Sequence, residues 1–351
     1  MQKIVFTGGG SAGHVIPNLA IIEELQRLGG FDLYYFGTDG IEKSIVAPLH
    51  IPYHSYSAPK LKRGYGLKET VNNLRIPHRF LKAVNEAKKG LRQVQPDLVF
   101  SKGGYVALPV VYAAAKLGIT CLSHESDLSP GLANRLMQKK CKRVLTAFPE
   151  TAQTFSNGIY CGQPIRGSLF GQSKGQAKKL LAGGTQRKVI LVFGGGSGSA
   201  AINAAVRKLA PELCKRYYLL HVCGKGNMVE SRIEHYRQFE FIEDMGTAYA
   251  AADLIIARSG AGAVFETIAL KKPAVFVPLE GQTRGDQKEN ADYFMRRGLC
   301  YVLPQSTLSE LKQTIDTALA DEKMREKLLL SPYSSGTKAV IRTILDCLHE
   351  A

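Results

Sequence analysis

The sequence predicts an α/β protein made of two similar doubly wound domains that face a shared cleft. Two apolar runs, residues 4–7 and 188–193, read as buried strands, and each ends in glycines before a helical pattern begins. One such strand–loop–helix unit opens each half of the chain. The length of 351 residues favours two domains, and 45% hydrophobic with 22% charged residues is typical of globular cores.

The first glycine loop, residues 8–14, reads GGGSAGH. Its helical pattern starts at Val15, with Pro17 in the first turn. Free backbone N–H groups and a helix dipole make such a loop attractive to phosphate or to a developing negative charge. Glycines 8, 10 and 13 match the dinucleotide fingerprint, yet His14 adds a group that titrates near neutrality. The alternative for His14 is a helix-start residue satisfied by the backbone.

Two more glycine loops lie in the second half, at 194–199 and 258–263. Glu266 follows the latter about two turns into a helix, too far along to cap it, which favours hydrogen bonding to a diol such as a ribose. The loop at 281–290 is rich in amides and carboxylates, as in sugar-binding sites.

Several first-half segments end in polar residues. Residues 31–36 form a predicted strand followed by Asp39, an acid that keeps a dinucleotide-dependent oxidoreductase as an alternative. Residues 40–70 are predicted to be irregular, a helix is predicted at 109–117, and the strand at 144–147 is expected to close the first sheet. The strand at 119–123 leads into His124, Glu125 and Asp127, where ligands bind in such sheets.

Glu125 suits the orientation or deprotonation of a substrate hydroxyl. A metal site is not predicted there, because neighbouring side chains alternate in direction. Arg166 follows a glycine–proline segment, where a guanidinium could meet a phosphate or form a linker salt bridge. The expected domains are 1–161 and 162–334, with a helix in 335–351 packing back across the boundary.

The net charge of +16 suggests a polyanionic partner. Between Lys60 and Arg92 there are ten basic residues and two acids, and residues 74–82 mix basic and bulky apolar side chains, as in segments that lie on lipid surfaces. The alternative is a helix whose apolar face packs on its own sheet. A nucleic-acid partner would explain the charge, but no binding motif is recognised.

Seven widely spaced cysteines without a C-x-x-C pair predict neither disulfides nor a zinc site. No signal segment is recognised, and no apolar stretch reaches the ~18 residues of a membrane span. We therefore expect a soluble protein of the reducing cytoplasm.

Together the motifs resemble the MurG family: GGGSAGH with Pro17, GGY at 103–105, His124-Glu125, GQPIR at 162–166, RSGA at 258–261 with Glu266, and Asp286-Gln287 with Asn290. The resemblance spans nearly the whole chain in the right order. It implies a GT-B fold with two Rossmann-like domains, the acceptor bound by the N-terminal one and the nucleotide sugar by the C-terminal one. It also implies an inverting, metal-independent transfer of GlcNAc from UDP-GlcNAc to the 4-hydroxyl of MurNAc on undecaprenyl-diphosphate-MurNAc-pentapeptide, without a cofactor, at the cytoplasmic membrane face.

By this resemblance His14 is the candidate general base, with Glu125 as competitor or helper. Ile242 would contact the uracil of the donor and Glu266 its ribose. Gln287 and Asn290 would contact the sugar, and Arg166 the diphosphate. Further donor contacts would come from Ser11, Ala12, Gly13, Asp127, Gly196, Ser197, Ala261, Gly262, Ala263, Val264 and Phe265. Gly103, Gly104 and Tyr105 would lie on the acceptor side. Leu74, Arg75, Ile76, Arg79, Phe80 and Lys82 would face an anionic phospholipid surface.

Three positions depart from the family pattern. Gly196 stands where a serine is often found, Asp127 where asparagine is common, and Ala12 where glycine is usual. A carboxylate facing a diphosphate repels it unless it is paired. The alternative function is another GT-B transferase with a lipid acceptor.

Overall fold

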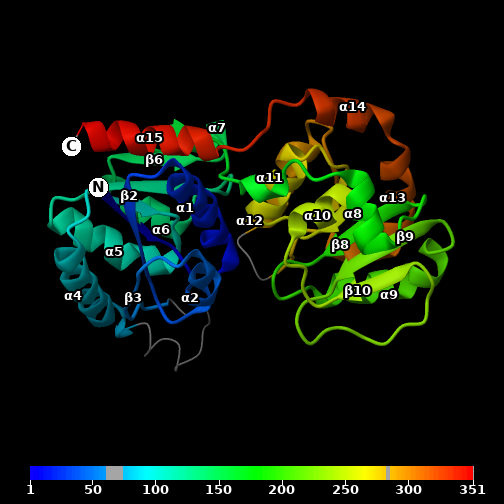
Figure 1. The fold of residues 1–351 in the computed structure, drawn as a ribbon, viewed down its shortest axis with the longest axis horizontal. Coiled ribbons are helices and arrows are strands. Elements are labelled where there is room, and N and C mark those ends of the chain that lie inside the picture. Colours follow the sequence, from blue (N-terminus) through cyan, green and yellow to red (C-terminus); the bar gives the residue numbers. More distant parts are fainter. Residues whose placement is uncertain (61–73, 282–284, 351) are drawn as a thin grey trace. The chain divides into compact units, whose positions relative to one another are not determined.

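The computed structural model describes residues 1–60, 74–281 and 285–350. Lys62, Arg63, Lys68 and Glu69 of the basic stretch, and residues 282–284 of the amide-rich loop, lie outside these ranges. The chain forms two compact units (Figure 1). Unit 1 comprises Met1–Arg166 and Ser335–Ala351, and unit 2 comprises Gly167–Ser334.

Within the described residues, unit 1 is built on a seven-stranded parallel sheet of order β3-β2-β1-β4-β5-β6-β7. Apolar runs such as Ile4–Phe6 form central strands because both faces of a parallel sheet are covered by helices. The strands are β1 (Gln2–Thr7), β2 (Phe31–Gly37), β3 (Tyr53–Ser55), β4 (Leu98–Ser101), β5 (Thr120–Glu125), β6 (Arg143–Thr146) and β7 (Gly158–Tyr160).

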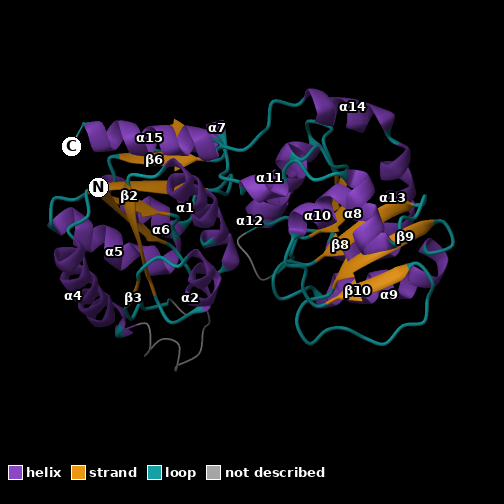
Figure 2. Cartoon of the chain, viewed as in Figure 1, coloured by secondary structure: helices purple, strands orange, loops and turns teal. Residues whose placement is uncertain are grey.

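Helices cover both faces of this sheet (Figure 2). They are α1 (Ile16–Leu28), α2 (Ile41–Val46), α4 (Ile76–Val94), α5 (Gly104–Lys116), α6 (Leu132–Met137), α7 (Pro149–Ala152) and α15 (Thr337–His349), with short 3-10 turns η1 (Ala12–His14), η2 (Ala47–Leu49) and η3 (Gln138–Lys140). Side chains alternate along β1: Ile4 and Phe6 pack with α1 and α15, whereas Val5 packs with α4 and α5.

Unit 2 repeats this architecture around a six-stranded parallel sheet of described residues, in the order β10-β9-β8-β11-β12-β13. The strands are β8 (Lys188–Phe193), β9 (Tyr217–Val222), β10 (Tyr236–Phe239), β11 (Leu254–Ala257), β12 (Ala274–Phe276) and β13 (Tyr301–Val302). The helices are α8 (Lys174–Ala182), α9 (Ala200–Leu213), α10 (Met245–Ala251), α11 (Ala261–Ala269), α12 (Asp286–Met295), α13 (Leu311–Ala320) and α14 (Glu322–Leu330), with 3-10 turns η4 (Gly167–Leu169) and η5 (Gln305–Glu310).

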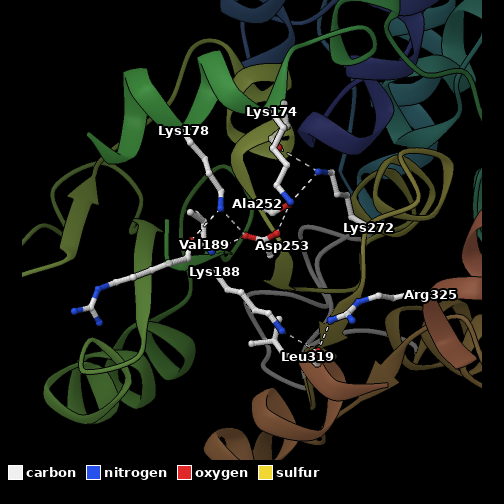
Figure 3. A network of polar contacts seen from close by, with 11 residues as sticks. Lys174, Lys178, Lys188, Val189, Ala252, Asp253, Lys272, Leu319 and Arg325 are labelled. Carbon is white, nitrogen blue, oxygen red and sulfur yellow. Dashed lines mark hydrogen bonds and ion pairs between the residues drawn. The ribbon is translucent and has the colours of Figure 1, made fainter. Parts of the chain in front are cut away.

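A partly buried group of ion pairs joins α8 to this sheet (Figure 3). Asp253, just before β11, accepts from the backbone N–H of Val189 at 2.8 Å and pairs with Lys178 at 3.1 Å and with Lys174. Lys272 lies in the same group and donates to the carbonyls of residues 250 and 252 at 3.2 and 3.0 Å. These ion pairs lie at the amino ends of β8 and β11, opposite the glycine loops.

The structure differs from the sequence expectation in four places. Residues 40–70 contain α2 and β3. The β5 strand continues through Glu125, α5 begins at Gly104, and β7 extends the sheet beyond β6, so β6 does not close it. The α2 helix and the β3 and β7 strands are short elements whose sequence signal is weak but which neighbouring strands and helix packing stabilise. The predicted cleft between the domains stays a prediction.

The chain passes from unit 1 to unit 2 after Arg166, five residues later than the sequence boundary, and returns at Ser335. The α15 helix packs within unit 1, against α1, with Val340, Ile344 and Leu348 in the shared core. Among the described residues, no helix is long and apolar enough to span a bilayer.

Candidate active site

The strand orders place glycine loops at both topological switch points. In unit 1 the chain order reverses between β1 and β4, and in unit 2 between β8 and β11. Ligands of doubly wound sheets bind beyond the carboxyl ends of such strands. We call the segments after β1, β4 and β5 the unit 1 loop cluster, and those after β8, β11 and β12 the unit 2 loop cluster.

The first two loops of unit 1 pack closely because glycines leave room for neighbouring side chains. Gly10 has φ +80°, and a Cβ there would overlap the Tyr105 ring. Gly104 has φ +79°, and its Cβ would lie 3.0 Å from Cδ2 of His14 and 2.8 Å from the Gly9 carbonyl. Larger residues at either position would separate the loops. The structure thus brings His14, Gly104 and Tyr105 together, and Lys60 lies 5.7 Å from the Tyr105 ring centroid.

His14, partly exposed at the end of η1, is oriented by the neighbouring loop. Its Nδ1 lies 3.3 Å from the carbonyl oxygen of Lys102. A carbonyl only accepts, so this contact places the ring proton on Nδ1 and leaves the Nε2 lone pair as the basic site. This is the tautomer that a general base requires. Ser11 and Gly13 beside it are exposed and Ala12 is half-buried.

Glu42 supports the first glycine loop through hydrogen bonds, a role that the sequence did not predict. This fully buried carboxylate accepts from Gly10 N at 3.1 Å and from Thr38 N at 3.0 Å, and also from the Thr38 hydroxyl. Burial raises its pKa, but these hydrogen bonds outweigh burial and hold the pKa below its usual value. The predicted ribose acid Asp39 is instead exposed, paired with Lys43 at 2.7 Å and Ser55 at 2.8 Å.

Glu125 organises the loop between β5 and α6. Its Oε1 accepts from Asp127 N at 3.0 Å, and its Oε2 accepts from Gly131 N at 2.7 Å and from Asn134 Nδ2 at 2.9 Å. Only 4% of Glu125 is exposed, so its geometry suits loop support better than proton abstraction. Asp127 is half-buried in this loop.

His124 is a structural histidine. It is fully buried, and its Nε2 lies 2.9 Å from the carbonyl oxygen of Gly162. This contact joins β5 to the segment after β7. Burial, with the nearby Lys102 charge, holds the pKa of His124 well below its usual value, so the ring is neutral.

Lys102 is a second residue that sequence reasoning missed. It is 1% exposed, and its Nζ donates to Ser126 Oγ at 2.5 Å, whose hydroxyl donates to Gln163 Oε1 at 2.6 Å. A serine–lysine–glycine sequence reads as an ordinary loop, so only the tertiary contacts reveal the buried charge.

Arg166 ends the first segment of unit 1 and is half-buried. It acts electrostatically on Glu23 of α1, whose pKa is raised by burial and lowered less strongly by Arg166. Both the linker salt bridge and the role at a diphosphate stay predictions.

In unit 2, the loop after β8 presents Gly195, Gly196 and Ser197 to solvent. Ser199 caps α9 by accepting from Ile202 N at 3.4 Å. The predicted donor-binding positions Gly196 and Ser197 are therefore accessible.

The donor-binding residues predicted on α11 differ in their exposure. Gly262, Ala263 and Glu266 are partly exposed, and Ala261 in the first turn is 8% exposed. Glu266 is the sixth residue of α11, and its Oε2 accepts from the Tyr249 hydroxyl at 3.1 Å. Val264 is fully buried with its N–H bonded to the Gly260 carbonyl, and Phe265 packs edge-on against Phe294 at 5.3 Å. These two residues belong to the core.

The other predicted donor contacts lie around α10 and α12. Ile242 is 8% exposed just before α10, which Asp244 caps by accepting from Thr247 N at 3.1 Å. In α12 Asn290 is fully buried, and the Gln287 side-chain oxygen accepts from Leu279 N at 3.1 Å, which ties α12 to the loop after β12.

The start of α4 exposes both apolar and basic side chains. Leu74 is 75% and Leu81 56% exposed, beside the exposed Arg75, Arg79 and Lys82. Ile76 is half-buried, and Phe80 packs edge-on against Tyr112 of α5 at 5.4 Å. The opposite side of α4 packs on the sheet through Val84, Ala87 and Leu91. The interpretation that the apolar face of this helix packs on its own sheet is therefore confirmed, and the lipid-surface interpretation stays a prediction.

Comparisons with known proteins cover both units. Residues 4–146 match the glycosyltransferase family 28 N-terminal domain, and residues 189–338 match the family 28 C-terminal domain. A Clostridium perfringens (strain SM101 / Type A) protein named UDP-N-acetylglucosamine--N-acetylmuramyl-(pentapeptide) pyrophosphoryl-undecaprenol N-acetylglucosamine transferase is 40% identical over 357 residues, covering 99% of each chain. A Clostridium novyi (strain NT) protein of the same name is 42% identical, covering 99% of this chain and 98% of its own.

Solved structures give the same picture. The crystal structure of Acinetobacter baumannii MurG superposes with a TM-score of 0.74 at 27% identity, covering 98% of this chain and 99% of that one. The calicheamicin glycosyltransferase CalG4 superposes with a TM-score of 0.73 at 17% identity, covering 99% and 98%, and shares the GT-B fold. A match of this extent over both units shows that the chain is a glycosyltransferase of family 28 and belongs to the MurG family.

Proposed function

We propose that the protein transfers GlcNAc from UDP-GlcNAc to the 4-hydroxyl of MurNAc in undecaprenyl-diphosphate-MurNAc-pentapeptide, the step that completes the lipid-linked peptidoglycan precursor. The full-length similarity to curated transferases with this named activity carries the proposal. Family membership rules out the oxidoreductase alternative.

In the proposed mechanism, Nε2 of His14 takes the proton of the acceptor hydroxyl, whose oxygen attacks the anomeric carbon of GlcNAc. The bond from that carbon to the UDP oxygen breaks, UDP leaves with the electron pair, and the configuration inverts. The contact from His14 Nδ1 to Lys102 O supports this role. Glu125 supports the β5 loop, since both of its oxygens accept hydrogen bonds.

The unit 2 loop cluster is proposed to bind the donor. Exposed loop amides at 195–197 and the start of α11 would stabilise the charge developing on the departing diphosphate without a metal. Glu266, oriented by Tyr249, would accept from the ribose hydroxyls. Ile242 would meet the uracil, and Gln287 and Asn290 the sugar.

Attachment to the anionic cytoplasmic face of the cell membrane is part of the same proposal. The acceptor carries a lipid, and Leu74 just before α4 and Leu81 on it are exposed among basic residues. Peripheral binding through this helix would bring the unit 1 loop cluster close to the acceptor.

The test is UDP release from UDP-GlcNAc with solubilised undecaprenyl-diphosphate-MurNAc-pentapeptide, in EDTA, for wild type and His14→Ala. We expect acceptor-dependent release to persist in EDTA and kcat to fall by roughly 10²–10⁴-fold in the variant, the usual contribution of a general base. NMR of the product should show a β-linkage.

His349→Ala, which removes an exposed histidine at the end of α15, is the matched control and should keep wild-type kcat. A wild-type kcat for His14→Ala would rule out His14 as the base. Loss of activity in EDTA, restored by added divalent cation, would contradict metal independence. Absence of acceptor-dependent release in the wild type would overturn the acceptor assignment.

A further inference from the structure

A buried cation lies beneath the unit 1 loop cluster. Lys102 follows β4, and its backbone N–H donates to Thr7 O at 2.8 Å while its carbonyl oxygen lies 3.3 Å from His14 Nδ1. Its side chain passes Gly8, where a Cβ would lie 3.0 Å from the Lys102 Cβ. One residue therefore contacts the end of β1, the glycine loop and the proposed base.

The ammonium group has defined partners. An ammonium only donates, so the Ser126 hydroxyl that accepts from it keeps its own proton for Gln163. Burial lowers the pKa of Lys102 to about 8, whereas Glu125 and Asp127 raise it. These two carboxylates, at the end of β5 and in the loop after it, act on the ammonium electrostatically.

The charges of Glu125, Asp127 and Lys102 affect how an anionic ligand binds to the unit 1 loop cluster. Two carboxylates beside loops that receive a diphosphate would repel it, and repulsion is strong where little water screens the charges. Three donors, the N–H groups of Asp127 and Gly131 and Nδ2 of Asn134, hold the Glu125 carboxylate in the loop. The buried Lys102 ammonium donates to Ser126, the residue between these two carboxylates in the sequence, and offsets part of their negative charge electrostatically.

We propose that Lys102 is a positioning residue for the anionic acceptor: its buried ammonium offsets the charge of Glu125 and Asp127, so that the loops after β1 and β4 accept a diphosphate. This role rests on the proposed function, because it concerns how that acceptor binds. Since only 1% of Lys102 is exposed, it acts through Ser126 and the two carboxylates rather than by touching substrate.

The test compares wild type, K102M, D127N and K102M/D127N by kcat and by the KM for each substrate. Methionine has a similar shape without the charge. We expect K102M to raise the acceptor KM about tenfold or more, with the KM for UDP-GlcNAc and kcat within about threefold, because one partner of a buried charge group is lost. Removing the Asp127 charge as well should return the acceptor KM to within about threefold of wild type.

The matched control is K43M/D39N, which removes an exposed Lys–Asp pair of unit 1 and should leave the acceptor KM unchanged. An unchanged acceptor KM in K102M, with an active wild type, would overturn the role of Lys102 while keeping the proposed function. A double variant no better than K102M would indicate packing instead. An inactive wild type would overturn the function itself.

A second measurement uses only wild type and D127N, in case K102M folds poorly. Raising the pH from 7 to 9 removes the Lys102 proton, since the pKa is about 8. Of the other groups facing this region, His124 is already neutral and burial raises the pKa of Tyr105. His14 is present in both proteins, so its titration contributes equally to the two profiles. The acceptor KM should rise with pH in wild type and rise less in D127N, and equal slopes would contradict the proposal.

Discussion

At the residue scale, the proposed base depends on side chains that bind no substrate. Glu42 receives three hydrogen bonds beneath Gly10, and Lys102 supplies the carbonyl next to His14. A glycine loop is positioned by such contacts, because its own residues have few side-chain interactions. The carboxylate of Glu42 is therefore as important to the loop's shape as the glycines.

Glu42→Gln should weaken unit 1 and the site together. The amide provides one acceptor where the carboxylate accepts from three donors, so about 1–3 kcal/mol of stability should be lost. The pKa of Glu42 is lowered on folding, so its contribution is full above the unfolded value of about 4.5 and is lost as pH falls through the folded value. Hydrogen exchange at β1 and β4 between pH 7 and pH 3 measures both effects.

Glu24→Gln is the control, because it breaks a surface pair with the 69% exposed Arg27 and should cost less than about 1 kcal/mol. Equal stability of E42Q and wild type at neutral pH would show that the loop does not depend on this carboxylate.

At the element scale, each sheet has two edges with different roles. The carboxyl ends of the strands carry the loop clusters, whereas the amino ends of β8 and β11 carry the ion pairs between Asp253 and the lysines of α8 (Figure 3). Burial and the two α8 lysines lower the pKa of the adjacent Lys272 to about 8, with Asp253 acting in the opposite direction. One carboxylate thus balances several cations at the structural edge of unit 2.

Asp253→Asn should destabilise unit 2 and leave unit 1 unchanged. The amide can still accept from Val189 N but cannot offset the lysines, so about 2 kcal/mol should be lost, less than for a fully buried pair because Lys174 is 54% exposed. Burial raises the pKa of Asp253, but Lys174, Val189 and Lys178 outweigh it, so its contribution is present above pH about 4 and is lost below. Hydrogen exchange at β8 and β11 is the measurement.

Glu212→Gln serves as the comparison, since Glu212 is 57% exposed and pairs with the 40% exposed Lys312, and it should cost less than about 1 kcal/mol. If the two variants lose the same stability, the partly buried position of Asp253 has no special effect.

At the scale of the whole molecule, the charge of +16 does not say which face meets a membrane. The structure distinguishes exposed leucines by their surroundings: Leu81 stands on α4 near Arg79 and Lys82, whereas Leu180 stands on α8 of unit 2. Substituting either by glutamate changes the net charge equally. The two variants therefore separate the effect of where the substitution lies from the effect of the total charge.

Leu81→Glu should weaken binding to vesicles of anionic phospholipid several-fold, because it removes an inserted apolar side chain and adds repulsion. Leu180→Glu, at 70% exposure, should bind like wild type. Vesicle co-sedimentation with measured dissociation constants decides between them. Equal weakening would mean that total charge governs attachment, and no weakening would exclude this face of α4.

The central strands and the order of motifs could be predicted because their signals are local. Runs such as residues 188–193 are apolar enough to be buried on both faces, and glycines with a following helical pattern mark the loops. Short edge elements such as β3, β7 and α2 escaped prediction, because a few residues gain their stability from neighbouring strands and helices rather than from propensity.

By itself, therefore, the sequence determined the α/β class, the family and the positions of the glycine loops, since each rests on residues close together in the chain. Only the tertiary structure decided which charges meet: Glu42 rather than Asp39 at the first loop, and Lys102 beneath His14. Such contacts join residues far apart in sequence, and burial then gives each charge its pKa and its effect.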